Sequence, residues 1–563
     1  MKMGKSKRIL LWTGASLLAL IVGLAIVFTM MTRVAPPLPD DPSADMLTVS
    51  EPGAGIRTIG RNWIMQNDHG LWEMYVTGKP YERGVVIGKL SEGLIRSQEK
   101  AFVGEISSRI PSAFYRNFLK YFIYWFNRDL DKYIPLEYRL EILGISQSAD
   151  PEFSFIGDNY RRLLNYHSAH DIGHAIRDFR LVACSSFGAW DGMSSDSSLI
   201  IGRNFDFYMG DEFAVNKIVC FERPDSGFAF AMVTWGGMIG TLSGMNERGL
   251  TVTINAAKSE IPFAARTPIS ILAREILQYA STIREAYAIA RKRQTFVSES
   301  LLIGSGNENR AAIIEKTPYE MALYEPSRNY IICTNHFQSV RFLNDPLNRK
   351  NMKESASLYR YERIDQDITS SAPLDPAGVA RILRDQAGLD DRNIGMGNEK
   401  AVNQLIAHHS VIFRPRQRQI WVSTSPWQLG SYLCYDLTNI FNNFAGLKNK
   451  KEITEKGLEI SPDPFLQSDG YIGFLKFRTM RKSLLRALSG KFRMVPENSF
   501  FTAFIASNRE YFEVYSLTGD YYRQFGNYTL AARYYRESLL KTIPVEGDKR
   551  AIIGKLADCI KNK

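Results

Sequence analysis

Cys184 is the residue whose type and setting point most directly to chemistry. It lies in Ala183-Cys184-Ser185-Ser186-Phe187, shortly before a strand-like run that ends in Gly202-Arg203-Asn204-Phe205-Asp206. An ordinary thiol has a pKa of about 8.5 and needs a base, and a free α-amino group, with a pKa of about 7.7 to 8.0, is such a base. Cleavage between Ala183 and Cys184 would therefore make one residue both nucleophile and proton acceptor.

Further motifs occur in a fixed order around Cys184. They are Tyr81-Glu82-Arg83-Gly84 with Gly88-Lys89-Leu90, then Cys184-Ser185-Ser186-Phe187, Gly202-Arg203-Asn204-Phe205-Asp206, Gly244-Met245-Asn246-Glu247-Arg248-Gly249-Leu250 and Thr334-Asn335-His336-Phe337. This ordered set resembles penicillin acyltransferase-like proteins of the acyl-CoA:6-aminopenicillanate acyltransferase type, relatives of choloylglycine hydrolases and acid ceramidase. These are N-terminal-nucleophile (Ntn) hydrolases, which cut their own chain. The resemblance covers about residues 78–363.

The resemblance implies a role for each matching charged residue. Cys184 would be nucleophile through its sulfur and base through its amine, with Asp206 orienting that amine and Arg203 beside the thiolate. A neighbouring cation lowers a thiol pKa, and a carboxylate can hold an amine for proton transfer. The alternative for Arg203 and Asp206 is a structural ion pair.

Two asparagines and one arginine complete the implied site. Asn255, in Thr253-Ile254-Asn255, and Asn335 resemble residues that bind substrate or the oxyanion, which fixed amide donors stabilise by about 3 to 4 kcal/mol each. Both asparagines have the alternative of being turn residues. Arg360 resembles an arginine near the nucleophile, with Arg363 as the other candidate.

Two rival motifs are weaker. His167, His170 and His174 have a spacing that could place three imidazoles on one helical face, but no Glu stands in an HExxH position. We expect no metal and no cofactor. Residues 240–244 miss the Gly-x-Ser-x-Gly pattern of serine hydrolases by one position and are interpreted as part of an active-site loop.

Composition narrows the class of protein. The 563 residues carry a net charge of +11, yet they contain no zinc-finger spacing or RNA-binding aromatic motif, so nucleic-acid binding is not expected. Five cysteines are too few for a disulfide framework, and Cys220 and Cys333 lie in apolar runs where we expect them to be buried.

The N-terminus predicts a membrane segment. Residues 9–31 are uncharged and apolar, and as a helix they span about 34 Å, enough to cross a bilayer. The stretch is longer than the core of most signal peptides, so a retained anchor is favoured over a cleaved signal. The basic tail, residues 1–8, predicts a cytoplasmic N-terminus and an extracytoplasmic body, periplasmic if the source is bacterial. Residues 32–56 are the linker.

Periodicity along the body predicts an α+β protein. Residues 57–183 are interpreted as a helical propeptide that becomes the small subunit, and residues 184–447 as the catalytic core. Expected strands lie at residues 198–201, 217–222, 228–235, 250–255, 311–315 and 330–334, with one helix over residues 268–293. Residues 448–500 form a basic extension, and residues 501–563 a helical cap like a tetratricopeptide repeat. The resemblance implies the four-layer αββα fold of Ntn hydrolases.

These observations together predict an autoproteolytic cysteine Ntn hydrolase. It would cleave a linear N-acyl amide, or transfer the acyl group through a Cys184 thioester. A small or lipid-like acyl amide is the expected substrate. The alternative is a catalytically inactive, membrane-anchored interaction protein that binds a protein partner through its C-terminal helices.

Overall fold

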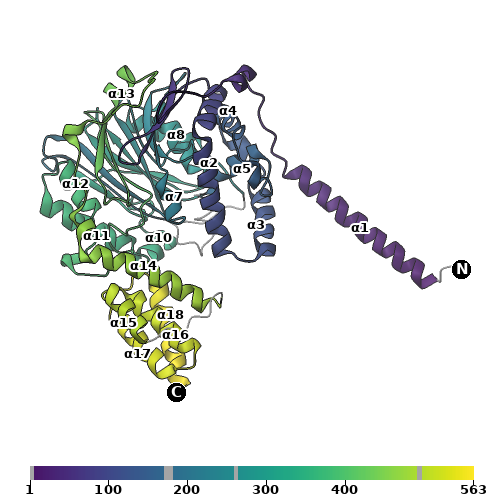
Figure 1. Ribbon diagram of the computed structural model, residues 1–563, viewed down its shortest axis with the longest axis vertical. Coiled ribbons are helices and arrows are strands. Elements are labelled where there is room, and N and C mark those ends of the chain that lie inside the picture. The colour runs from purple at the N-terminus through teal and green to yellow at the C-terminus, as the bar shows by residue number, and fades with distance from the viewer. Residues whose placement is uncertain (1–4, 170, 172–181, 259–263, 491–497, 563) are drawn as a thin grey trace.

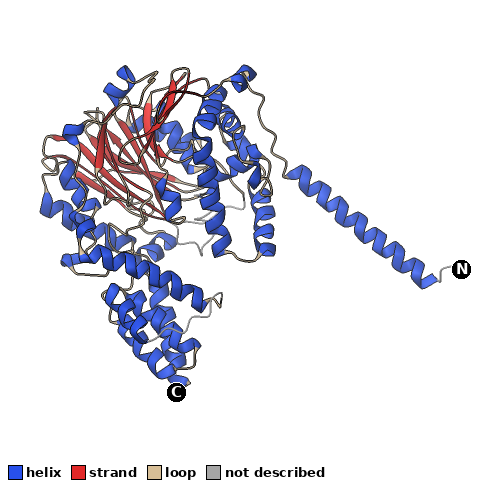
Figure 2. Ribbon diagram, in the orientation of Figure 1, coloured by secondary structure: helices blue, strands red, loops and turns tan. Residues whose placement is uncertain are grey.

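The computed structural model describes residues 5–169, 171, 182–258, 264–490 and 498–562. It is a mixed helix and sheet protein, in which two β-sheets lie in the middle of a body flanked by helices (Figures 1 and 2). A group of C-terminal helices lies at one end of this body. The N-terminal helix α1 (Lys5–Met31) projects away from it.

The larger sheet has eleven strands and includes segments from both sides of Cys184. Its spatial order is β1-β2-β3-β4-β7-β8-β9-β10-β11-β12-β13. The strands β4 and β7 pair in parallel and the other neighbours are antiparallel. Their bounds are β1 Ser50–Gly53, β2 Ile56–Ile59, β3 Asn62–Gln66, β4 Trp72–Gly78, β7 Ile218–Pro224, β8 Phe230–Thr234, β9 Ser243–Asn246, β10 Leu250–Ala256, β11 Glu299–Ser305, β12 Arg310–Lys316 and β13 Met321–Tyr324.

The first strands correct the predicted helical character of residues 57–78. Gly55, Gly60 and Gly70 have positive φ and lie in the turns between β1, β2, β3 and β4, a backbone conformation that a right-handed helix does not contain. The larger sheet thus draws strands from the predicted propeptide as well as from the predicted core. A division of the chain at Cys184 therefore does not coincide with a boundary between sheets.

The smaller sheet contains Cys184. Its order is β14 (Tyr330–Cys333), β5 (Val182–Asp191), β6 (Ser197–Phe207), β15 (His409–Arg414), β16 (Gln419–Ser423) and β17 (Tyr432–Asp436), all antiparallel. The six strands expected from the sequence are confirmed, five of them with bounds within two residues of an observed strand. The sixth, expected at residues 198–201, is the first part of the longer strand β6.

Three hydrophobic clusters account for the packing of helices and sheets. The first joins one face of the larger sheet to α2 (Pro80–Arg109), α4 (Leu136–Ser146), α5 (Asn159–His167), α8 (Ile269–Tyr279) and α9 (Ile283–Lys292), and it includes Cys184. The second contains side chains of both sheets, such as Tyr75 and Val411. The third joins the smaller sheet to α11 (Ser357–Ser371) and α12 (Pro376–Leu383).

The remaining helices include α3 (Ala113–Phe126), α7 (Asp211–Val215), α10 (Pro346–Glu354) and α13 (Leu437–Asn443). The single helix expected over residues 268–293 is wrong, because the segment forms α8 and α9. Thr282 begins α9 with a capping box, in which its side chain accepts from the Glu285 N–H and Glu285 accepts from the Thr282 N–H.

The C-terminal part is helical, as expected. It consists of α14 (Asp469–Leu488), α15 (Asn498–Ser507), α16 (Phe512–Gln524), α17 (Tyr528–Leu539) and α18 (Glu546–Lys561), with α17 packed against both α16 and α18. The apolar side of α14, Phe474, Phe477 and Leu484, is buried in the cluster that also contains Phe504.

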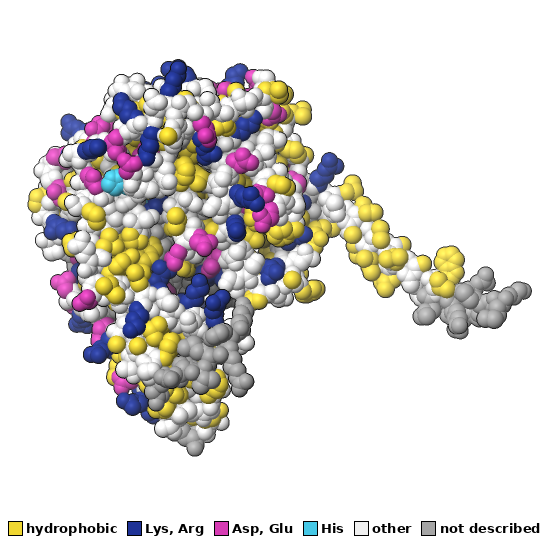
Figure 3. All heavy atoms as spheres, in the orientation of Figure 1, with side chains coloured by type: hydrophobic (Ala, Val, Ile, Leu, Met, Phe, Trp, Pro, Cys, Tyr) yellow, Lys and Arg dark blue, Asp and Glu magenta, His cyan; other side chains and the backbone are white. Residues whose placement is uncertain are grey.

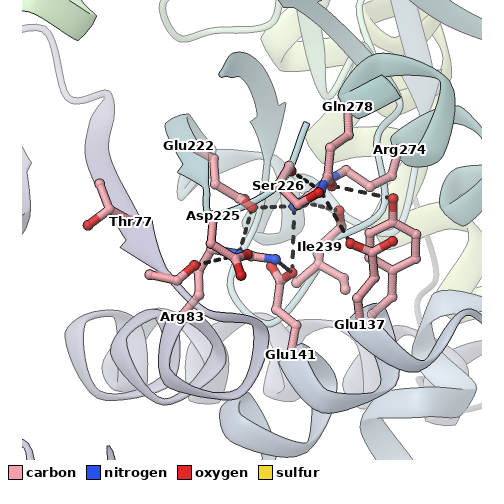
Figure 4. Close-up of polar contacts among 12 residues, drawn as sticks. Thr77, Arg83, Glu137, Glu141, Glu222, Asp225, Ser226, Ile239, Arg274 and Gln278 are labelled. Atoms are coloured by element: carbon pink, nitrogen blue, oxygen red, sulfur yellow. Dashed lines mark hydrogen bonds and ion pairs between the residues drawn. The ribbon is translucent and has the colours of Figure 1, made fainter. Parts of the chain in front are cut away.

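A buried ion-pair cluster ties the segment before Cys184 to the segment after it (Figure 4). Arg83 of α2 lies 2.6 Å from Glu141 of α4 and 2.8 Å from Glu222 of β7. Arg274 of α8 also pairs with both glutamates. All four side chains are fully buried, so each charge depends on its partners because water is excluded.

Gly84 lets α2 and α4 approach closely enough to form this cluster. A Cβ built at Gly84 would lie 2.0 Å from the carbonyl oxygen of Glu141, a backbone atom that cannot turn aside. Gly93, on the same helix, is exposed, and a Cβ there meets open space. The two glycines of α2 therefore form a matched pair for mutation.

We predict that Gly84→Ala lowers stability by at least about 1 to 3 kcal/mol, the usual cost of overpacking a core. Gly93→Ala should leave stability unchanged or raise it by up to about 1 kcal/mol, because alanine is the better helix former. Thermal midpoints of the two purified variants, compared with the unchanged chain, provide the measurement. Equal midpoints for both variants would contradict the close helix contact.

Candidate active site

The pairing of β5 with β6 brings the first predicted site residues together. In this register Cys184 is opposite Phe205, Ser186 is opposite Arg203, and Ala183 is opposite Asp206. Directly opposed residues project from the same face of a sheet. Residues two apart in one strand share a face as well, so Cys184, Ser186 and Arg203 all project from the same side. Arg203 Nη2 lies 3.7 Å from Cys184 Sγ.

The backbone of Cys184 contacts two other predicted residues. Its N–H donates to Asn335 Oδ1 at 3.0 Å, and its carbonyl oxygen accepts from Arg360 Nη1 at 2.8 Å. Arg360 Nη2 also donates to Asn335 Oδ1, at 2.7 Å. Asn335 follows β14, which pairs with β5 on the side away from β6, and Arg360 projects from α11. Sulfur, nitrogen and oxygen of one cysteine thus each have a different polar partner.

The geometry distinguishes the two candidate arginines. Arg360 also donates to Ser185 Oγ at 2.9 Å and is fully enclosed beside Cys184. Arg363, one turn later on α11, pairs instead with Asp367, Asp385 and Asp391. The arginine beside the cysteine is therefore Arg360.

Asn255 lies in the same buried region but is not bonded to Cys184 in the contacts described. Its Oδ1 accepts from Ser186 Oγ at 2.8 Å, and its Nδ2 donates to the carbonyl oxygen of Cys333 at 2.9 Å. Through these bonds Asn255 of β10, in the larger sheet, is joined to β5 and β14 of the smaller sheet. In the uncut chain its amide is directed to structural partners.

Burial dominates the electrostatics of the site. It raises the pKa of the Cys184 thiol to about 11, although Arg203 acts to lower it. Burial also raises the pKa of Asp206 to about 7, against the lowering effect of Arg360 and Arg203. Asp206 Oδ2 accepts a hydrogen bond from Gln404 at 3.3 Å. In the uncut chain, therefore, the thiol is neutral at physiological pH and Asp206 is close to its midpoint.

Ser243 and His409 contact Nη1 of the Arg203 guanidinium, whereas Nη2 contacts Cys184 Sγ. Arg203 Nη1 lies 2.5 Å from Ser243 Oγ and 3.2 Å from His409 Nε2, and these two side chains lie 2.7 Å apart. Residues 240–244 are expected to form an active-site loop, but Ser243 is the first residue of strand β9. His409 carries no sequence signal, because only the pairing of β15 with β6 brings it opposite Phe205.

An apolar pocket begins close to Cys184. Phe207 is the diagonal cross-strand neighbour of Cys184, a relation that separates Cα atoms by about 7 to 8 Å. Phe207 stacks at 6.2 Å on Trp235, and both rings line the pocket. The other lining residues come mainly from α2, α5, α7 and the loop after β8: Ile95, Gln98, Glu99, Phe102, Leu163, Tyr166, Ala169, Phe213, Gly236, Gly237 and Met238.

The histidine-rich motif lies only partly within the described structure. His167 is buried at the end of α5, where its Nδ1 lies 2.8 Å from the Leu163 carbonyl oxygen and its Nε2 accepts from the Ile239 N–H. Burial lowers its pKa to about 4. His170 and His174 lie outside the described residues. Within the described ranges, no group of three or more His, Cys, Asp or Glu side chains could hold a metal ion.

We predict that Asp206 makes stability pH-dependent. Because burial raises its pKa from 3.8 to about 7, the native chain retains a proton that the unfolded chain has already lost between about pH 4 and 7. Stability should fall as pH rises through this window, and Asp206→Asn should remove that fall. In a Cys184→Ala background, the thermal midpoint of Asp206→Asn relative to its parent should therefore rise with pH. A constant difference would contradict the buried carboxyl.

Parts of this chain are similar to known proteins. Residues 193–425 match the family model described as acyl-coenzyme A:6-aminopenicillanic acid acyl-transferase. An uncharacterised protein of Archaeoglobus fulgidus is 26% identical over 282 residues, which cover 47% of this chain and 46% of that protein. The chain thus spans about half the length of this relative.

Two further matches have named activities. N-acylethanolamine-hydrolyzing acid amidase of Caenorhabditis elegans is 24% identical over 219 residues, 37% of this chain and 59% of that protein. The structure of penicillin V acylase from Agrobacterium tumefaciens aligns with 45% of this chain and 86% of its own at 15% identity and a TM-score of 0.32. The family match confirms the resemblance to penicillin acyltransferase-like Ntn hydrolases that the ordered motifs predict.

Proposed function

We propose that the protein is an autoproteolytic cysteine Ntn hydrolase that cleaves a linear N-acyl amide or transfers its acyl group. The observation that carries this proposal is the setting of Cys184. Its sulfur lies beside Arg203, its nitrogen beside Asn335 and its carbonyl oxygen beside Arg360. A buried structural cysteine needs no such partners, since it packs as a small apolar side chain.

Activation begins with the bond before Cys184. The Cys184 sulfur adds to the carbonyl carbon of Ala183, the C–N bond between the two residues breaks, and the thiol proton passes to the Cys184 nitrogen. Water then hydrolyses the resulting thioester. The products are a carboxylate on Ala183 and a free thiol and amine on Cys184. We propose that Asp206, which pairs with Ala183 across the sheet and has a pKa of about 7, carries the proton.

The same groups then serve catalysis. The new amine accepts the thiol proton as sulfur attacks the substrate amide, and Asp206 orients that amine. The new Cys184 amine keeps N–H groups that can donate to Asn335 Oδ1, which also accepts from Arg360. Asn255 and Asn335 amide groups are the donors for the oxyanion, and Arg203 stabilises the thiolate. Water or another amine or thiol then takes the acyl group from the Cys184 thioester.

The apolar pocket near the site supports a substrate with an apolar acyl group. Its rings, Phe102, Phe207, Phe213 and Trp235, offer an apolar wall to a chain attached at Cys184. The name of the nematode relative supports this substrate class, since that enzyme hydrolyses N-acylethanolamines. An N-acyl amide with an apolar acyl chain is therefore the proposed substrate.

The fold and location are proposed on the same basis. The first hydrophobic cluster packs helices on the larger sheet, the second packs the two sheets together, and the third packs helices on the smaller sheet. This order supports the four-layer αββα fold. Residues 11–31 form one helix long and apolar enough to cross a membrane, and none of that apolar window is buried. This exposure supports a retained anchor, and the preceding basic tail supports an extracytoplasmic body.

We predict that Arg360→Lys lowers turnover of N-acyl amides by about 10²- to 10³-fold, the usual loss when a positioned charged donor is removed from a site of this kind. Arg363→Lys is the matched control, because it changes the same residue type on the same helix without touching Cys184. Release of acid and amine from a panel of N-acyl amides gives the measurement. Equal losses in both variants, or no release by correctly cut protein, would contradict the proposal.

A further inference from the structure

Helix α3 carries an exposed aromatic face. This helix, AFYRNFLKYFIYWF, buries only its last residue. The side chain of Phe114 is 85% exposed and that of Phe118 57%, values that are unusual for rings in a water-facing helix. The full set of exposed rings is Phe114, Tyr115, Phe118, Tyr121, Phe122 and Trp125.

The C-terminal end of the apolar helix α1, where it joins the body, contacts this face. Phe28 packs edge-on against Tyr121 at 6.0 Å and stacks on Trp125 at 6.3 Å. Arg161 Nη2 donates to the carbonyl oxygen of Thr32 at 2.7 Å, which fixes the chain just after α1 to α5. The aromatic face of α3 therefore lies where α1 leaves the body, and Figure 3 shows hydrophobic side chains along α1 beyond that point.

The charges on α3 have one sign. The segment contains Arg116 and Lys120 and no Asp or Glu. Lys120 lies 4.9 Å above the ring of Tyr121, and Arg128, just after the helix, lies 4.5 Å above the ring of Trp125. Basic side chains with apolar stems over aromatic rings are suited to the boundary between lipid tails and anionic headgroups.

We propose that α3 lies in the interfacial layer of the same membrane that α1 spans, with its exposed rings among the lipid headgroups and upper acyl chains. Tyrosine and tryptophan prefer this layer because they have an apolar body and a polar end. Each buried ring removes about 150 to 250 Å² from water, so several together hold a helix at the surface. The inference rests on the proposed anchoring by α1 and not on the proposed hydrolysis.

One consequence is a fixed orientation of the body. A single spanning helix as the only membrane contact would let the body rotate over the membrane. A second contact through α3, next to the end of α1, limits that rotation. The aromatic face then fixes the orientation of the body on the membrane, and the basic residues give it a preference for anionic lipid.

The cysteine content makes a direct test simple. All five native cysteines are buried and free, so a cysteine placed on the surface can be labelled selectively. We would use the full-length Cys184→Ala chain with either Phe118→Cys or, as a matched control, Val340→Cys, whose native side chain is 91% exposed on the body. Each variant carries an environment-sensitive fluorophore and is reconstituted into vesicles of phosphatidylcholine and phosphatidylglycerol, with or without lipid bearing a quencher in its acyl chain.

We expect the label at position 118 to shift its emission to the blue and to be quenched several-fold more strongly by acyl-chain quencher than the label at position 340. Equal, water-like signals at both positions would overturn the proposal. A protected label at position 118 that acyl-chain quencher does not reach, together with energy transfer between copies, would also overturn it, because the face would then be an interface between two copies of the chain. The readout needs no activity, so failure of the hydrolase proposal is scored separately.

In the same vesicles, the double charge reversal Arg116→Glu and Lys120→Glu should reduce the quenching at position 118. The reduction should become larger as the fraction of phosphatidylglycerol rises. Both side chains are partly exposed and donate to backbone carbonyl oxygens, so thermal midpoints are needed to identify any variant that fails to fold. Quenching that is indifferent to this charge reversal would contradict the role of the basic residues.

Discussion

The pairing of β5 with its two neighbours is the interaction on which the candidate site depends. On one side β6 supplies Arg203 and Asp206 through a register that places them beside the bond before Cys184. On the other side β14 ends just before Asn335. Strand register has a period of two, so a slip by one residue would turn Arg203 to the opposite face and remove it from the thiol.

Buried charge explains how a chain cut at Cys184 would keep that register. Arg83 and Glu141 precede the cut, whereas Glu222 and Arg274 follow it, and all four are enclosed together. Separating the two segments would break the Arg83–Glu222 and Arg274–Glu141 pairs, which join them. The first strands of the larger sheet add backbone hydrogen bonds across the same division. Cleavage would thus change the chemistry of Cys184 while leaving its surroundings in place.

The sequence motifs divide into two groups in the structure. One group, around Cys184, Arg203 and Asn335, forms the site, and its members could be predicted because their types suit one reaction. The other group builds the frame: Arg83 and Gly84 join two helices, and Asn246 accepts from two backbone N–H groups of its own turn. The strands before residue 79 differ from the helical character expected there, and their turns contain Gly55, Gly60 and Gly70 with positive φ. His409 could not be predicted, since its place beside Arg203 arises from strand pairing across 206 residues.

The central claim is that the chain breaks its own backbone before Cys184. N-terminal sequencing and intact mass of mature protein, purified beside a Cys184→Ala variant, test it most directly. The account predicts two fragments that remain together under native conditions, the second beginning at Cys184, and a single uncut Cys184→Ala chain. An active, mature protein that is still continuous through Ala183 and Cys184 would contradict the account.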